Sequence, residues 1–199
     1  MTPENVQAAL NVSRETLDKF AAYLALLEKW QKSVNLVARG TLEIAWQRHI
    51  LDSGQLVRYL PRDCNIIMDV GSGAGFPGLV LSIMQEATVH LVESDHKKNV
   101  FLQTVIRELG LSATVHNARI ESLLALAPDV ITARAFAPLG KAIDLIAPHM
   151  ASHTVLLLLK GRNVEEELTE MPDYPIMSAV TYPSLSDPEG MVLQLTQDD

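Results

Sequence analysis

The 199-residue sequence contains one cysteine, no apolar run long enough to cross a membrane, and no basic residue after Arg162. The single cysteine, Cys64, excludes an intrachain disulfide and is typical of a reducing cytoplasm. The longest aliphatic run, residues 155–159, is far shorter than the roughly 20 residues that span a bilayer, and no N-terminal segment resembles a signal peptide. We therefore expect a cytoplasmic protein with no membrane partner. A monomer is the default expectation, although nothing in the sequence specifies the oligomeric state.

The net charge of −8 argues at first against a nucleic-acid partner, but the charges are unevenly distributed. All sixteen basic residues and fifteen of the 24 acids fall within residues 1–162, which leaves that part of the chain with a net charge of +1. The other nine acids lie in residues 163–199. The acidity thus belongs to the C-terminal end, and a basic surface elsewhere remains possible.

A glycine-rich turn follows a short apolar stretch, residues 66–70, whose polar member is Asp69. The turn reads Gly71-Ser-Gly-Ala-Gly-Phe-Pro-Gly78, and glycine is needed where φ is positive or where a ligand approaches the main chain. An acid two residues before the first glycine is typical of S-adenosylmethionine (AdoMet) sites, where its carboxylate binds a water or the cationic amino group of the methionine moiety. The dinucleotide pattern G-x-G-x-x-G also occurs from Gly73. That register starts two residues beyond the strand and places Pro77, which has no N–H, where a pyrophosphate needs donors. We therefore favour AdoMet.

A second acid, Glu93, ends another predicted strand and lies twenty-two positions after Gly71. In doubly wound α/β folds, an acid about 20 residues past the glycine turn binds ribose hydroxyls. The simpler alternative is that Glu93 only caps the helix that begins near Asp95. Together with Asp69 and the spaced glycines, Glu93 favours a nucleoside ligand.

Strands and helices alternate in the predicted secondary structure from residue 66 onward. We expect strands at 66–70, 88–93, 113–116, 129–133 and 153–159, and helices near 77–85, 96–109, 121–126, 139–148 and 163–170. This alternation indicates parallel β-α-β units with helices on both faces of the sheet. Two further apolar stretches, 176–182 and 190–196, predict an antiparallel hairpin at the sheet edge.

Residues 1–60 are predicted to be helical. Pro3 suits a first helical turn after Thr2, residues 17–30 show helical apolar spacing, and residues 42–53 suggest a second amphipathic helix weakened by Gly54. We therefore expect an N-terminal helical extension, residues 1–60, before an α/β domain, residues 61–199.

Basic residues follow four of the predicted strands: Lys97 and Lys98, Arg119, Arg134, and Lys160. Any one of them alone would most often be a solvated surface charge. The carboxyl ends of parallel strands share one edge of the sheet, however, and ligands bind at that edge. Together these residues predict a basic rim beside the nucleoside site, which suits a polyanion such as RNA.

The sequence lacks the groups used for several kinds of base methylation. No Asn/Asp-Pro-Pro-aromatic run follows the fourth strand for attack by an exocyclic amine, no Pro-Cys nucleophile exists for pyrimidine C5, and no His/Cys cluster has metal-ligand spacing. Guanine N7 carries a free lone pair and needs no base. In-line transfer to N7 would depend on alignment and electrostatics alone.

His49 and Asp52 lie three positions apart on the second predicted helix, beside Arg48. A pair on the helix surface or in helix packing is the default interpretation, because no third residue is spaced to complete a metal site. Asn35 lies in the link before this helix, where Asn is most often a turn residue.

The chain resembles, over nearly its whole length, the ribosomal RNA small subunit methyltransferase G family, also called glucose-inhibited division protein B. The specific motifs are the Gly71–Gly78 turn after Asp69 and the string Arg48-His-Ile-Leu-Asp-Ser53. Supporting segments are Trp30–Leu36, Glu93–Lys98 with Phe101-Leu102, Asn117–Glu121, Ala133–Ala135 and Lys160-Gly161. Members of the family carry an Arg-His pair before the last strand and a Lys at the end. This chain departs from them with Glu189-Gly-Met191 and Asp198-Asp199 in those places.

The resemblance implies a Rossmann-like class I fold and transfer of a methyl group from S-adenosyl-L-methionine to N7 of a guanine in 16S rRNA, free or in the small ribosomal subunit. Together with the motifs, it predicts cofactor contacts at Asp69, Gly71, Ser72, Gly73, Phe76, Glu93, Ile120, Glu121 and Arg134. Predicted RNA contacts are Arg48, His49, Lys97, Lys98, Arg119 and Lys160. Arg134 and Asn35 are candidate positioning residues, and we expect no dedicated catalytic base and no metal.

Two other functions stay open. A nicotinamide-dependent oxidoreductase is disfavoured by the register of the glycines and by the lack of an obvious acid or base for hydride transfer. A non-catalytic ribosome assembly or RNA-binding factor that keeps the fold is disfavoured by the intact set of Asp69, Gly71, Gly73 and Glu93.

Overall fold

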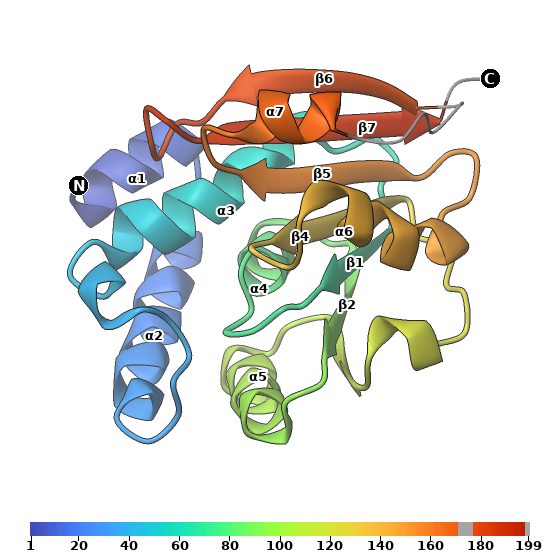
Figure 1. The fold of residues 1–199 in the computed structure, drawn as a ribbon. Helices are drawn as coiled ribbons and strands as arrows, with labels where there is room; N and C mark the ends of the chain where they lie inside the picture. The colour runs from blue at the N-terminus through green and yellow to red at the C-terminus, as the bar shows by residue number, and fades with distance from the viewer. Residues whose placement is uncertain (171–176, 198–199) are drawn as a thin grey trace.

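The computed structural model describes residues 1–170 and 177–197, which form a seven-stranded sheet with the order β3-β2-β1-β4-β5-β7-β6 (Figure 1). The strands are β1 (Ile66–Val70), β2 (Thr88–Glu93), β3 (Ala113–Asn117), β4 (Val130–Arg134), β5 (Val155–Lys160), β6 (Met177–Pro183) and β7 (Met191–Gln197). Strands β1 to β5 are parallel, and β7 runs antiparallel to both β5 and β6. The predicted mostly parallel sheet with an antiparallel hairpin at its edge is confirmed; residue 176 of that prediction lies outside the described residues.

Helical segments cover both faces of this sheet. They are α1 (Pro3–Leu10), α2 (Arg14–Gln31), η1 (Arg39–Thr41), η2 (Trp46–Leu51), α3 (Asp52–Gly54), η3 (Gln55–Tyr59), α4 (Gly78–Met84), α5 (His96–Leu109), η4 (Ile120–Ser122), α6 (Leu139–Ile146), η5 (Ala147–His149) and α7 (Val164–Thr169). Within the described residues, no helix is both long and apolar enough to cross a membrane.

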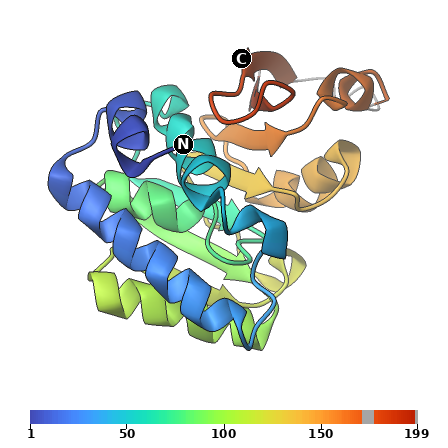
Figure 2. The ribbon, with the colours of Figure 1, turned by 90° about the vertical axis from the view of Figure 1, so that its left-hand side faces the viewer.

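The alternation of side chains along β5 shows how the sheet separates two cores. Leu157 and Leu159 belong to a core that also contains residues of α2, α4 and α5, whereas Leu156 and Leu158 pack with residues of α6 and α7. Successive side chains on a strand point to opposite faces, so a strand that is apolar throughout must be covered on both sides. In Figure 2, α2 runs alongside α5 on the first of these faces. The N-terminal helices therefore share their core with the sheet.

The helix starts at the N-terminus follow their capping residues. The Thr2 side chain accepts from the Asn5 N–H and Pro3 occupies the first turn, as the sequence predicts, while the Ser13 side chain caps α2. The second predicted helix is irregular instead. Residues 46–59 run through a π-helical turn, one α turn and a 3₁₀ turn, and such π turns are frequent at functional sites.

Gly54 has a packing role in this irregular segment. A Cβ at this position would stand 2.5 Å from Leu10 Cδ1 and 3.1 Å from Met84 Sδ. The missing side chain thus lets the segment pass closely between α1 and α4.

The helix predicted for residues 121–126 is wrong beyond its first turn. The structure has only the 3₁₀ turn η4 there, and the chain then runs irregularly to Pro128. Leu124 is 89% exposed and Ala127 has a φ of +45°. Leu123 and Leu126 still pack against the core on the α6 side of the sheet, but from an irregular chain. Neither the left-handed residue nor the following proline can continue a helix.

Candidate functional site

The glycine turn connects β1 to α4 as predicted. Gly71 and Gly73 have φ values of +67° and +57°, in the left-handed region that glycine adopts without the steric penalty of a Cβ. The first α-helical residue is Gly78, directly after Pro77. This places the G-x-G-x-x-G register that starts at Gly73 in a turn that ends on a proline, which weakens the dinucleotide alternative.

Asp69 lies beneath the turn and does not face an opening. Its side chain is fully buried, Oδ1 accepts a hydrogen bond from Thr132 Oγ1 at 2.7 Å, and Gly78 packs so closely that a Cβ there would stand 2.8 Å from Asp69 Cβ. Burial raises the pKa of Asp69 to about 6, against the opposing effect of the Thr132 hydrogen bond. In this geometry Asp69 braces β1 against β4 and α4; a direct contact with a ligand does not fit its burial.

Glu93 holds the glycine turn to the end of β2. Its Oε2 accepts from the Gly73 N–H at 2.9 Å and its Oε1 from the Asp95 N–H at 2.8 Å. The cap of α5 is Asp95, whose carboxylate accepts from the N–H groups of Lys97 and Lys98 at 2.8 and 3.0 Å. The alternative that Glu93 serves only as a helix cap is therefore wrong.

Two neighbouring cavities open at the carboxyl ends of the strands, where ligands of such sheets bind. The first, here called the turn cavity, has a volume of about 240 Å³ and lies beside the glycine turn. The second, the β5 cavity, measures about 210 Å³ and lies beyond β4 and β5. Phe136 and Ala137 line both cavities, so the loop after β4 is their common wall.

The lining of the turn cavity contains groups that could hold the nucleoside part of AdoMet. Of the nine predicted cofactor residues, those lining it are Gly71, Glu93, Ile120 and Glu121. Bare backbone at Gly71 permits close approach of a ligand, the Glu93 carboxylate suits ribose hydroxyls, and the buried Ile120 presents an apolar surface to a base. Ser72 points elsewhere, because its hydroxyl donates to the Asp69 carbonyl at 2.9 Å.

Phe76 lies in the protein interior instead of bordering this cavity. Its ring is stacked between Tyr23, with centroids 5.1 Å apart, and His49, with centroids 4.7 Å apart. The Arg134 guanidinium lies 5.1 Å from the ring centroid, in cation–π range. Phe76 thus fixes the turn against α2 and η2, and its predicted cofactor contact does not fit its 3% exposure.

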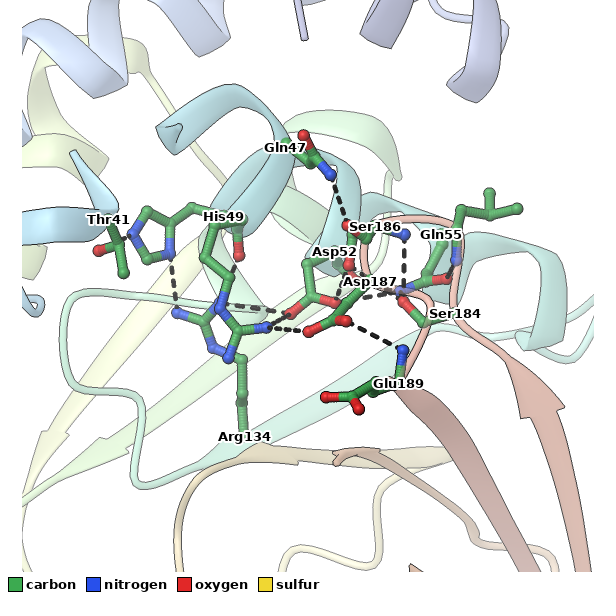
Figure 3. Close-up of polar contacts among 12 residues, drawn as sticks. Thr41, Gln47, His49, Asp52, Gln55, Arg134, Ser184, Ser186, Asp187 and Glu189 are labelled. Carbon is green, nitrogen blue, oxygen red and sulfur yellow. Dashed lines mark hydrogen bonds and ion pairs between the residues drawn. The ribbon is translucent and has the colours of Figure 1, made fainter. Parts of the chain in front are cut away.

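Arg134, at the end of β4, is the centre of a buried polar network (Figure 3). Nη1 donates to the Arg48 carbonyl at 3.0 Å and to Asp52 Oδ2 at 3.4 Å, and Nη2 lies 3.2 Å from His49 Nδ1. Arg134 lines the β5 cavity and not the turn cavity. It therefore joins the N-terminal segment to the edge of the sheet where the two cavities meet.

His49 is a neutral acceptor in this network. Burial, together with the charges of Arg134 and Arg48, lowers its pKa to about 3. Because Arg134 donates to Nδ1, the ring proton is on Nε2, which lies 2.9 Å from Thr41 Oγ1; that hydroxyl donates to the Ala38 carbonyl at 2.6 Å. With 3% exposure, His49 offers almost no surface to RNA, and the RNA contact predicted for it does not fit this structure.

Asp52 extends the network to the turn between β6 and β7. Its Oδ1 accepts from Ser186 Oγ at 2.6 Å and from Gln55 Nε2 at 3.3 Å. Gln47 Nε2 donates to the Ser186 carbonyl at 2.7 Å. Of the two default interpretations of the His49/Asp52 pair, a helix-surface position is wrong, because both side chains are buried. The pair is packed inside the protein, with polar partners on β4 and in the turn between β6 and β7. The partners from residues 184–186 were not foreseen, and no local pattern marks them.

Sequence reasoning also missed Tyr23. This buried side chain on α2 donates its hydroxyl hydrogen to the Ala74 carbonyl within the glycine turn, and burial raises its pKa well above the ordinary value. A tyrosine among the apolar positions of an amphipathic helix was the available signal, since a buried phenol needs a partner.

The residues of the predicted basic rim differ in how exposed they are and in whether they are paired with an acid. Arg48, 45% exposed, lines the β5 cavity, and the exposed Arg119 lines the turn cavity. Lys160 also lines the β5 cavity, but its side chain is 13% exposed and paired with Glu167 at 2.6 Å. Lys97 is exposed at the start of α5, and Lys98 is half-buried next to it.

The other candidate positioning residue, Asn35, is not at either cavity. It is exposed in the loop after α2, where its Oδ1 accepts from Gln31 Nε2 at 3.4 Å. This contact agrees with a turn role.

The cavity walls contain charges but few groups suited to acid–base chemistry near neutral pH. Among the described residues that line the two cavities there is no His, Cys or Tyr. Across residues 1–170 and 177–197, no group of three or more His, Cys, Asp or Glu side chains could hold a metal ion. The arrangement provides binding surfaces and fixed charges.

Comparison with known proteins identifies the fold and the family of this chain. The family model for rRNA small subunit methyltransferase G matches residues 16–190. The ribosomal RNA small subunit methyltransferase G of Rhodospirillum rubrum is 46% identical over 98% of this chain and 97% of its own length, and that of Parvibaculum lavamentivorans is 48% identical over 96% and 88%. A solved SAM-dependent methyltransferase from Aquifex aeolicus superposes with a TM-score of 0.60 at 14% identity, covering 81% of this chain and 94% of that one. The fold is therefore the Rossmann-like class I methyltransferase fold, and the chain belongs to the rRNA small subunit methyltransferase G family.

Proposed function

We propose that this protein transfers a methyl group from AdoMet to N7 of a guanine in 16S rRNA. The observation that carries the proposal is the pair of adjoining cavities. One is lined by Gly71 and Glu93, the other has Arg48 at its rim, and the two share Phe136 as a wall. Family membership and the names of the relatives support methylation of small-subunit rRNA.

Gly71, Glu93, Ile120 and Glu121 would hold AdoMet in the turn cavity. The Glu93 carboxylate has one oxygen on the Gly73 N–H and the other on the Asp95 N–H, so its orientation is set before any ligand arrives. When bound, AdoMet supplies a methyl group on a positively charged sulfur. The chain's own contribution is to orient that ligand and to close the site with Phe136.

Guanine N7, the acceptor atom, carries no proton that the protein would have to remove. Guanine N7 has a free lone pair at neutral pH, so it can attack without a general base. This agrees with the lack of His, Cys and Tyr among the described lining residues. Rate enhancement would come from alignment of the two reactants and from fixed charges.

The RNA side of the site requires an accessible guanine. In an A-form helix the N7 edge lies in a groove too deep and narrow for side chains, so the target would be an unpaired or distorted nucleotide. Arg119, Lys97 and Lys98 would contact phosphates around it. Each such contact adds salt dependence to binding.

A methylation assay with 16S rRNA or small subunits that lack the modification tests the proposal. We expect an N7-methylated guanine, no transfer when the target is replaced by 7-deazaguanine, and a single-turnover rate nearly flat from about pH 6 to 8.5 because no base titrates in that range. A rate that rises tenfold per pH unit, or transfer to the 7-deaza substrate, would mean another acceptor atom. RNA binding without any methyl transfer would favour an assembly factor, and binding of NADH in place of AdoMet would favour an oxidoreductase.

A further inference from the structure

The charged side chains around the β5 cavity differ in how closely they are already paired with other groups of the protein. Asp52 is held by Arg134, Ser186 and Gln55. Lys160 and Glu167 are paired with each other at 2.6 Å, and Glu167 also accepts from the Leu139 N–H at 2.8 Å. These groups stabilise the wall of the cavity, and a ligand could engage them only by breaking close contacts.

Arg48 and Asp187 form the loose pair at this wall. Arg48 Nη1 lies 4.0 Å from Asp187 Oδ2 and 3.8 Å from Asp52 Oδ2, both longer than a hydrogen bond. The side chains of Arg48 and Asp187 are 45% and 44% exposed. A guanidinium offers five donors and a carboxylate about four acceptor sites, so both retain capacity for a ligand.

The turn that carries Asp187 is held in place. Ser186 donates to Asp52 at 2.6 Å, the Leu185 N–H donates to Gln55 Oε1 at 2.8 Å, and Asp187 Oδ1 accepts from the Glu189 N–H at 3.0 Å. These bonds leave Oδ2 directed toward Arg48. A donor and an acceptor are thus presented side by side from two segments 139 positions apart, a form of preorganisation that binding sites need.

Guanine has the matching pattern on its Watson–Crick edge: the acceptor O6 next to the donors N1–H and N2–H. Adenine presents the reverse order, with a donor at N6 and an acceptor at N1. Resting on the proposed function, we propose that Arg48 and Asp187 recognise the Watson–Crick edge of the target guanine. Asp187 accepts from N1–H and N2–H, and Arg48 donates to O6. Asp187 would then have a specific role in binding RNA. The other acids of residues 163–199 would only repel the RNA backbone.

The test combines Asp187→Asn with substitution of inosine, which lacks only the N2 amino group, for the target guanosine. The asparagine keeps an oxygen for the Glu189 N–H but replaces the second acceptor with a donor. Each enzyme is assayed for kcat/KM on both RNAs, and its AdoMet affinity is measured by calorimetry. Glu189→Gln is the matched control, because Glu189 lies in the same turn, pairs with Arg162 at 3.3 Å and does not line the cavity.

We expect the parent and Glu189→Gln to prefer guanosine over inosine by roughly tenfold or more, the range for a hydrogen bond to a charged group. For Asp187→Asn, kcat/KM on the guanosine RNA should fall by roughly ten- to a hundredfold. Its kcat/KM values on the two RNAs should be similar, and its AdoMet affinity should be unchanged. Arg48→Gln should slow both RNAs alike, because both bases carry O6. If Asp187→Asn keeps the parental preference, the assignment is overturned while the proposed function stands. If the parent forms no N7-methylguanine, the proposed function fails and this inference fails with it.

Discussion

The ring of Phe136 lies directly on the backbone of Gly71. A Cβ added at Gly71 would stand 2.6 Å from Phe136 Cδ2, and Gly71 has a φ of +67°. Both the close approach and the backbone conformation therefore require glycine. A ligand that uses this bare backbone has to share the space with the Phe136 ring, so the loop after β4 must respond when the turn cavity is filled.

Gly71→Ala should abolish AdoMet binding, measured by calorimetry. Gly110 is a matched control, because its φ is +63° and nothing lies within 4 Å of an added Cβ. Either substitution should cost about 1–2 kcal/mol of unfolding free energy through left-handed strain, and at Gly71 the close contact with Phe136 adds to that cost. Only the substitution at Gly71 should abolish AdoMet binding. Equal AdoMet affinities for the two variants would mean that the ligand binds elsewhere.

Glu93→Gln should weaken AdoMet binding and destabilise the glycine turn. One of the two carboxylate oxygens that accept from Gly73 and Asp95 becomes an NH₂ group facing a backbone N–H. An unmade bond of this kind costs about 1–3 kcal/mol, measurable by urea unfolding. Glu108→Gln, an exposed acid on α5, serves as the control and should change neither quantity. Normal stability and affinity for Glu93→Gln would rule out the role assigned to this carboxylate.

His49 should make stability depend on pH in a defined direction. Its pKa is about 3 in the folded protein and near 6.5 when unfolded. Between these values the unfolded chain binds a proton that the folded chain does not, so the folded state loses stability as pH falls below about 6.5, by about 1 kcal/mol per pH unit. The raised pKa of Asp69 acts in the opposite sense at acidic pH.

Comparison with His49→Gln isolates this effect, because Asp69 is common to both proteins and its contribution cancels. The unfolding free energy of the parent minus that of His49→Gln should decrease from pH 7 to pH 5. A difference that does not vary with pH would show that His49 is not buried as a neutral ring.

Arg134→Lys should destabilise the protein by about 1–3 kcal/mol, because a single ammonium cannot serve the Arg48 carbonyl, His49 and Asp52 at once. Arg14→Lys, on an exposed pair with Asp18, should cost well under about 1 kcal/mol. In a double-mutant cycle with Asp52→Asn, the effects of Arg134→Lys should be non-additive. Additive losses would mean that Arg134 and Asp52 act independently.

Much of the architecture could be predicted from local patterns. The predicted strands agree with β1 to β5 within a residue or two. Four of the five are short apolar runs, and β3, Ala113–Asn117, follows from the alternation of strands and helices. The positive φ values at the glycine turn and the position of Glu93 at the end of β2 likewise follow from residue type and spacing. The helix predicted over 121–126 failed because Leu123 and Leu126 reach the core from an irregular chain, while Leu124 stays exposed and Ala127 has a left-handed backbone.

The sequence by itself determined the order of strands and helices and the place of the glycine turn, since backbone conformation and side-chain periodicity are properties of neighbouring residues. Only the tertiary structure decided what the charged and aromatic residues contact. Arg134 meets His49 across 85 positions, Phe76 is enclosed between rings from α2 and η2, and Asp69 is sealed beneath Gly78. Burial and hydrogen-bond partners arise from packing between distant segments, and no local pattern records which segments will meet.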